Sequence, residues 1–215
     1  DFWADRGVDG FRLDAALTLV KRDGVSSKGL PETHAVIKRI RKHLDDRHGG
    51  RIVLLAESHM EVDKLKSFFG QGDECQLAYH FPLAESLLLA LMFDERERVD
   101  EMLEESAGIP ENCAWVVFLR NHDEISLATL PIIRRTTLIS LIDPQGEYLF
   151  NHGQATAVRL ANIFPDDARL REALRLLYST PGAHVMYYGD EIKMKNLPRE
   201  AGVVDTRVFV RGPFD

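Results

Sequence analysis

The sequence predicts an α/β fold in which crossover helices join the strands of a parallel sheet. Short apolar runs of strand length alternate along the chain with longer segments of helical periodicity. The apolar runs are continuous, which is typical of strands buried on both faces of a parallel sheet. A doubly wound sheet and a β/α barrel both fit this alternation. Charged residues at the ends of at least three strands favour the barrel.

The first half of the chain is expected to form three strands separated by helices. In residues 7–14 the apolar side chains of Val8, Phe11 and Leu13 are bounded by glycines, which predicts the first strand. Pro31 suits the first turn of a helix, which is expected to continue at helical spacing until Gly49 and Gly50. The segments that follow are expected to be a strand over 52–57, a short helix over 62–69 and a strand over 77–81 that Pro82 ends.

The second half is expected to continue this alternation. The elements predicted from periodicity are an apolar helix over 83–92, a charged helical stretch to 105, a strand over 114–119, helices over 154–162 and 168–178, and a strand over 184–188. Residues 126–153 are expected to be irregular, because Pro131, Pro144 and Gly146 fall within them.

Composition and charge restrict the partners of this protein. The chain has 215 residues, of which 45% are hydrophobic and 28% charged, as in an ordinary globular protein. The net charge of −7 argues against nucleic acid or an anionic membrane surface as a partner, and no apolar run has the length of a membrane span. Cys75 and Cys113 are too few for a disulfide framework or a zinc site. They fit a cytoplasmic protein, although a piece of a longer chain can have lost a secretion signal.

Three carboxylates stand at the ends of three expected strands, and they are the candidate catalytic residues. Asp14, Glu57 and Asp123 each follow an apolar run. Arg12 lies two residues before Asp14, so both side chains point to the same face of the strand, and His122 precedes Asp123. Each carboxylate alone could instead cap a helix or pair with a surface cation.

Paired carboxyl groups in different environments are what glycoside hydrolysis requires. One must be ionised to attack the anomeric carbon, and the other must be protonated to give its proton to the leaving oxygen. Arg12 would favour the ionised form of Asp14, and the apolar run before Glu57 would favour the protonated form there. No phosphate-binding loop and no metal-ligand spacing is recognisable, so no metal or other cofactor is predicted.

Three segments resemble signature stretches of the α-amylase family, glycoside hydrolase family 13, and they occur in the family's order. They are 7–15 (GVDGFRLDA), 55–57 (LAE) and 118–124 (FLRNHDE), and 188–191 (YGDE) is similar to a fourth. The resemblance implies a (β/α)₈ barrel that acts on α-glucosidic bonds with retention of configuration. This chain would supply strands four to eight of that barrel.

The same resemblance assigns roles to five residues. It implies that Asp14 is the nucleophile, Glu57 the general acid and base, and Asp123 the third carboxylate, which bonds sugar hydroxyls. Arg12 would support the nucleophile, and His122 would contact the sugar. The expected partner is therefore a small α-glucoside or oligosaccharide, with no prediction for the oligomeric state.

Within the family, further segments are similar to the trehalose synthases. These are 30–34 (LPETH), 72–75 (GDEC), 80–83 (HFPL) and 109–113 (IPENC). They imply interconversion of maltose and trehalose by intramolecular glucosyl transfer through a covalent glycosyl-enzyme. An α-amylase or α-glucosidase that hydrolyses α-1,4 bonds is an alternative, and a non-catalytic sugar-binding relative or an inactive fragment is another.

The expected domain organisation is a partial one. The resemblance implies that residues 1–215 are part of a catalytic barrel domain, without its N-terminal strands and its inserted domain, and inactive alone. Many amylases have a Lys-His pair after the nucleophile, with the histidine carbonyl on calcium. Residues 16–20 lack this pair, so calcium is not predicted from this chain, although it remains open for the full-length parent.

Overall fold

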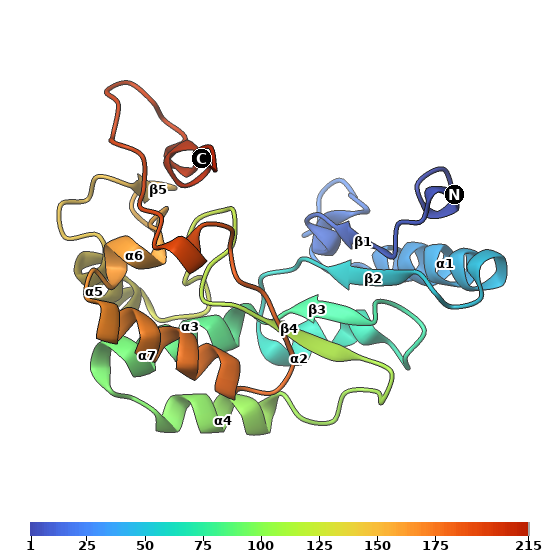
Figure 1. Cartoon of the computed structure of the whole chain (residues 1–215). Coiled ribbons are helices and arrows are strands. Elements are labelled where there is room, and N and C mark those ends of the chain that lie inside the picture. The colour runs from blue at the N-terminus through green and yellow to red at the C-terminus, as the bar shows by residue number, and fades with distance from the viewer. Residues whose placement is uncertain (215) are drawn as a thin grey trace. The chain divides into compact units, whose positions relative to one another are not determined.

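The computed structural model describes residues 1–214 and divides the chain into two compact units (Figure 1). The first unit holds residues 1–80 and 103–116, and the second holds 81–102 and the chain from 117 onward. Each unit is described by itself. Among residues 1–214, no helix combines the length and the apolar character that a membrane crossing needs.

The first unit is built on parallel strands in the order of the sequence. They are β1 (Gly10–Leu13), β2 (Val53–Ala56), β3 (Leu77–Tyr79) and β4 (Ala114–Val117), the last residue of which begins the second unit. The connections contain α1 (Pro31–His48), α2 (Val62–Lys66) and the 3-10 helices η1 (Ala4–Arg6), η2 (Ala16–Thr18) and η3 (Ser67–Phe69). Helix α1 runs beside β1 and β2 (Figure 1). This arrangement confirms the expected parallel α/β pattern.

Helix α1 has the ends that its sequence predicts. Pro31 is its first residue, where a backbone N–H has no partner within the helix. Gly49 follows its last residue with a φ of 62°, a left-handed conformation that glycine adopts without steric cost, and its N–H bonds the carbonyl of Asp45 at 2.9 Å. Ile37 and Leu44 bury one face of the helix.

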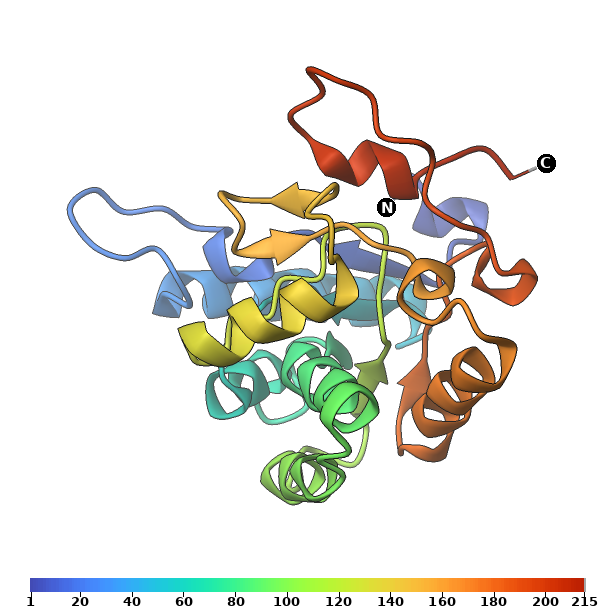
Figure 2. The same cartoon turned by 90° about the vertical axis from the view of Figure 1, so that its left-hand side faces the viewer.

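The second unit is mainly helical. Its helices are α3 (Phe81–Phe93), most of α4 (Glu97–Glu105), α5 (Ile132–Ile142), α6 (Leu160–Ile163), α7 (Asp167–Ser179) and the 3-10 helices η4 (Asp190–Ile192) and η5 (Thr206–Val210). Its short strands are the antiparallel pair β5 (Leu149–Phe150) and β6 (Ala155–Thr156), side by side in Figure 2, and β7 (Ala183–His184). After β7, the N–H of Val185 donates to the carbonyl of Val117 at 2.9 Å.

Two predicted elements of the second unit were wrong, and a third begins earlier than expected. The region 126–153 is not irregular, because it contains α5, and Pro131 stands at the N-cap of that helix instead of interrupting it. Residues 154–162 do not form one helix. They hold β6 and begin α6, because the backbone of Thr156 pairs with Ile125 and its hydroxyl bonds Asp143 at 2.8 Å. Helix α3 begins at Phe81, since Pro82 is tolerated in a first turn.

The core of the second unit explains why α5 forms. Leu138, Ile139 and Ile142 of α5 are buried with Leu88 and Leu89 of α3. Helix α3 also packs against α7. The stabilisation of α5 therefore comes from tertiary burial of one apolar face, which a local reading of its prolines does not register.

Candidate active site

In the first unit, Arg12 joins the two predicted catalytic carboxylates Asp14 and Glu57. Its Nη1 donates to Oδ1 of Asp14 at 2.8 Å, and its Nη2 lies 3.5 Å from Oε2 of Glu57. Arg12 lies in β1, Asp14 follows β1 and Glu57 follows β2, so the parallel pairing of these strands brings the three side chains to one edge. The sequence placed Arg12 beside Asp14 but did not predict its contact with Glu57.

The backbone after β1 is turned so that it also faces Glu57. Ala15 has a φ of 44°, which is uncommon for a residue other than glycine and marks local strain. Its N–H donates to Oε2 of Glu57 at 2.7 Å, and the next amide, of Ala16, donates to the Glu57 carbonyl at 2.9 Å. The expectation of a mainly apolar surrounding for Glu57 was therefore incomplete, because an amide and a guanidinium both face one of its oxygens.

Tyr79 of β3 is a further residue near this group. Burial raises the pKa of the Tyr79 phenol, while the positive charge of Arg12 opposes the shift and the negative charge of Glu57 adds to it. Tyr79 and the neighbouring His80 are both buried. Tyr79 additionally lies within electrostatic reach of the Arg12 and Glu57 charges.

In the second unit, the predicted Asp123 and His122 lie directly together after β4. Nε2 of His122 is 3.1 Å from Oδ2 of Asp123. The other carboxylate oxygen, Oδ1, accepts a hydrogen bond from Nη2 of Arg211 at 2.6 Å and a longer one from Nη1 of Arg207 at 3.4 Å. Arg211 also donates from Nε to the His122 carbonyl at 2.9 Å.

The two arginines were missed from the sequence. They lie near the end of the sequence, beyond the segments that resemble the family. Arg207 is also bound by Asp205, and this contact raises the pKa of Arg207 and lowers that of Asp205. Two cations four residues apart in an otherwise apolar segment are the one local signal that could have drawn attention to them.

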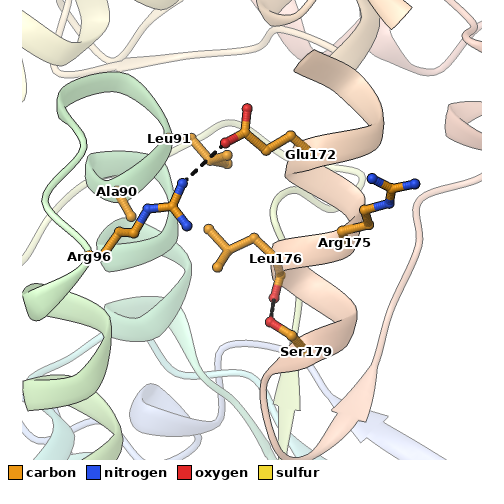
Figure 3. A pocket seen from close by; sticks show the side chains of 7 residues that line it. All are labelled: Ala90, Leu91, Arg96, Glu172, Arg175, Leu176 and Ser179. Carbon is orange, nitrogen blue, oxygen red and sulfur yellow. Dashed lines mark hydrogen bonds and ion pairs between the residues drawn. The ribbon is translucent and has the colours of Figure 1, made fainter. Parts of the chain in front are cut away.

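A pocket in the second unit lies apart from the predicted site residues. It has a volume of about 290 Å³, and Figure 3 shows Arg96 reaching toward Glu172, to which it is ion-paired at 3.3 Å. Its lining comes from α3, α7 and the segment before α4, namely Ala90, Leu91, Arg96, Glu172, Arg175, Leu176 and Ser179. None of the five predicted site residues is among them, so this pocket is not part of the candidate active site.

No metal centre emerges from the part of the chain that the structure describes. Within residues 1–214, no three or more His, Cys, Asp or Glu side chains are grouped so that they could hold a metal ion. The predicted site residues themselves offer carboxylates, a guanidinium group and a histidine, which are groups used in acid–base and nucleophilic catalysis.

The parallel strands, crossover helices and strand-end carboxylates define an α/β domain of the kind found in enzymes, and comparison with known proteins identifies its family. A family model described as the alpha amylase catalytic domain matches residues 1–209. The chain belongs to the α-amylase family. It is 41% identical over 198 residues to a trehalose synthase of Thermus thermophilus, covering 92% of this chain and 20% of that protein.

Two further relatives extend this similarity. A trehalose synthase/amylase of Mycolicibacterium smegmatis is 40% identical over 91% of this chain and 33% of its own length. A trehalose synthase of a Pimelobacter species is 35% identical over 90% of this chain and 35% of its own length. The chain thus spans between 20% and 35% of the length of these relatives.

Solved structures support the fold. A sucrose 6F-phosphate phosphorylase from Thermoanaerobacter thermosaccharolyticum superposes with a TM-score of 0.73 at 21% identity, over 90% of this chain and 40% of that one. An α-amylase from H. orenii gives a TM-score of 0.61 at 19% identity, over 93% and 34%. These structures are barrel enzymes of the α-amylase family, which confirms the expected fold class.

Proposed function

We propose that this chain carries the catalytic carboxylates of a retaining α-glucoside-active enzyme that interconverts maltose and trehalose. The observation that carries the proposal is the group formed by Arg12, Asp14 and Glu57, in which one guanidinium contacts both carboxylates. The similarity to trehalose synthases over 90% or more of the chain supports the choice of substrates.

Asp14 and Glu57 divide the reaction between them. The Asp14 carboxylate attacks the anomeric carbon of maltose and forms a covalent bond to the sugar, while Glu57 gives its proton to the glycosidic oxygen that leaves. In the second half, Glu57 takes a proton from the anomeric hydroxyl of the released glucose, which attacks the same carbon and displaces Asp14. Two inversions return the original configuration and yield trehalose.

The remaining predicted residues act on the sugar and on its charge. Arg12 orients the Asp14 carboxylate for attack, because its Nη1 lies 2.8 Å from Oδ1 of Asp14. Asp123 and His122 bond sugar hydroxyls, and these bonds strengthen as the transition state forms. In this proposal Arg211 and Arg207, which occupy one oxygen of Asp123, share that carboxylate with the sugar.

Hydrolysis is the second candidate activity. The name of the Mycolicibacterium relative includes amylase activity, and a Culex pipiens protein 22% identical to this chain is named an α-glucosidase. If water reaches the glycosyl-enzyme in place of the released glucose, the same residues produce two glucose molecules from maltose. The two activities differ in how well the site retains glucose.

Incubation of the full-length protein with maltose tests the proposal. We expect trehalose as the main product, identified by chromatography, and loss of all turnover in Asp14→Asn. Asp46→Asn makes the same chemical change on α1, where Asp46 pairs with Lys42, and should leave turnover unchanged. Glucose as the sole product would contradict the isomerase and favour the hydrolase. Full activity of Asp14→Asn would contradict the assignment of the nucleophile.

We also propose that residues 1–215 are part of a larger barrel domain. Strand β1 lies at the edge of the sheet of the first unit. Its Phe11 and Leu13 line a cavity of about 700 Å³ whose other lining residues are Asp1, Arg12, Arg39, Ile40, His43, Leu44 and Leu54. Parallel sheets bury both faces of their strands, so a cavity with apolar side chains beside an edge strand favours further covering elements. Turnover of maltose by the 215-residue chain alone would contradict this proposal.

A cytoplasmic location is the last part of the proposal. Cys75 and Cys113 are both free thiols, which is typical of proteins in a reducing compartment. Fractionation of the producing cells, with the protein followed by an antibody, tests it. Recovery outside the cytoplasm would contradict it.

A further inference from the structure

The second unit contains a buried group of charged and aromatic side chains next to Asp123. We call Arg120, Arg159, Tyr187 and Asp190 the buried cluster. The two guanidinium groups lie on the Tyr187 ring, each 4.7 Å from its centroid. Oδ1 of Asp190 is 3.7 Å from Nη1 of Arg159. All four residues are less than 9% exposed, so their charges interact through protein and not through water.

The cluster forms hydrogen bonds to the backbone of residues 205–211, which we call the C-terminal segment. Nη2 of Arg159 donates to the carbonyl of Val210 at 2.7 Å, and the hydroxyl of Tyr187 donates to the same carbonyl at 3.1 Å. Nη1 of Arg159 donates to the carbonyl of Tyr188 at 2.7 Å. The carbonyl of Val210 therefore accepts hydrogen bonds from two buried side chains, those of Arg159 and Tyr187, which are distant from it in the sequence.

The cluster is also hydrogen-bonded to the loop that carries Asp123. Nη2 of Arg120 donates to the Asp123 carbonyl at 2.7 Å. Arg211 follows Val210 directly, and its guanidinium bonds the Asp123 carboxylate at 2.6 Å and the His122 carbonyl at 2.9 Å. The cluster thus holds the backbone on both sides of the ion pair between Arg211 and Asp123.

Burying these charges is costly, which makes a purely stabilising role a poor explanation. Two arginines face one buried aspartate, so the cluster holds more positive than negative charge, and apolar side chains could fill the same space at lower cost. Burial also raises the pKa of Asp190 to about 6, against the opposing effect of both arginines. A fixed hydrogen-bond geometry is what the arginines supply and apolar side chains cannot.

We propose that the buried cluster is a positioning device that holds Arg211 and Asp123 in the relative geometry that the candidate site needs. Tyr187, Arg159 and Arg120 are then positioning residues that act through two backbone carbonyls. The inference rests on the proposed function, because it assigns the cluster to the site in which Asp123 bonds the sugar.

Two variants of the full-length protein loosen the cluster without removing its bulk. Tyr187→Phe keeps the aromatic ring that both guanidinium groups face and removes the hydroxyl, which bonds the Val210 carbonyl and interacts with the Tyr188 side chain. Arg159→Lys keeps the charge but not the planar fork that reaches two carbonyls. Thr180→Val is the matched control, because it also removes a buried hydroxyl that bonds a backbone carbonyl of the second unit, at the end of α7.

Trypsin reports directly on the C-terminal segment. Its targets there are the peptide bonds after Arg207 and Arg211, and mass spectrometry identifies each cut. We expect faster cleavage at these two positions in Tyr187→Phe, and faster still in Arg159→Lys, than in the control. We also expect kcat/KM for maltose to fall about fivefold in Tyr187→Phe, the effect of one hydrogen bond, and further in Arg159→Lys.

The outcomes separate the inference from the proposed function. If both variants match Thr180→Val in cleavage and in kcat/KM, the cluster does not position the segment and the inference is wrong. A fall in kcat/KM without faster cleavage at Arg207 and Arg211 also overturns it, because the effect then does not pass through the segment. If the wild-type protein turns over no maltose, the proposed function fails, and the cleavage rates alone decide the inference.

Discussion

His80 allows a stability change to be worked out from the structure. Its ring is fully buried, with Nε2 at 2.5 Å from the hydroxyl of Ser106 and the ring centroid 4.4 Å from that of Trp115. Burial, with a smaller contribution from the charge of Lys66, lowers the pKa of His80 from 6.5 to about 3. The imidazole is therefore neutral in the folded protein at any pH well above 3.

The direction of the pH effect follows from this depressed pKa. In the unfolded chain His80 takes up a proton below pH 6.5, while in the folded protein it does not until about pH 3. Its contribution to stability is therefore complete above pH 6.5 and is lost as the pH falls toward 3. Between about pH 7.5 and about pH 5 the loss is ~2 kcal/mol, from 1.36 kcal/mol for each pKa unit.

Urea unfolding of the wild type and of His80→Gln at these two pH values measures the effect. The other titrating groups are present in both proteins, so they cancel in the difference between the two pH dependences. We expect the wild type to lose ~2 kcal/mol more than the variant on acidification. Ser106→Ala keeps the imidazole and should retain the wild-type pH dependence. An equal loss in wild type and His80→Gln would refute the reasoning.

Three further predictions concern the site and its support. Glu57→Gln should lower kcat for maltose by about 10² to 10⁴-fold, because the amide cannot transfer the proton, and an unchanged kcat would remove Glu57 from the mechanism. Asp190→Asn should flatten the loss of unfolding free energy that the wild type shows as the pH rises from about 4 to about 6. The reason is that burial raises the pKa of Asp190 to about 6, although Arg120 and Arg159 oppose this shift, so ionising Asp190 costs stability in the folded protein. An equal loss of unfolding free energy in the wild type and in Asp190→Asn between these two pH values would count against it. Gly10→Ala should lower the unfolding free energy by about 1–3 kcal/mol, because the added Cβ would lie 2.7 Å from the carbonyl oxygen of Val53 on β2. A variant as stable as the wild type would show that β1 and β2 can separate there.

Local sequence signals were sufficient where an element has clear ends. Pro31 and Gly49 bound α1, because each residue has a backbone preference that acts without any partner. The same signals failed at Pro131, which was interpreted as a break and instead stands at the N-cap of α5. A proline favours a helix start and a helix interruption alike, and the choice depends on whether an apolar face finds a partner, as α5 does on α3.

The candidate site was predictable where the residues follow strands. Arg12, Asp14 and Glu57 lie together because β1 and β2 are neighbours in a parallel sheet, and the parallel pattern could be inferred from the continuous apolar runs. The contact between Arg12 and Glu57 needed the register, which sequence periodicity does not specify.

By itself, the sequence determined the order of most strands and helices, the carboxylates at three strand ends and the resemblance to the α-amylase family. These features depend on neighbouring residues and on motifs of a few positions. Only the tertiary structure showed that Arg211 and Arg207 bond Asp123 across 88 and 84 residues of sequence, and that a buried cluster holds their segment. Such contacts depend on the path of the chain between them, and the packing of a whole core decides that path.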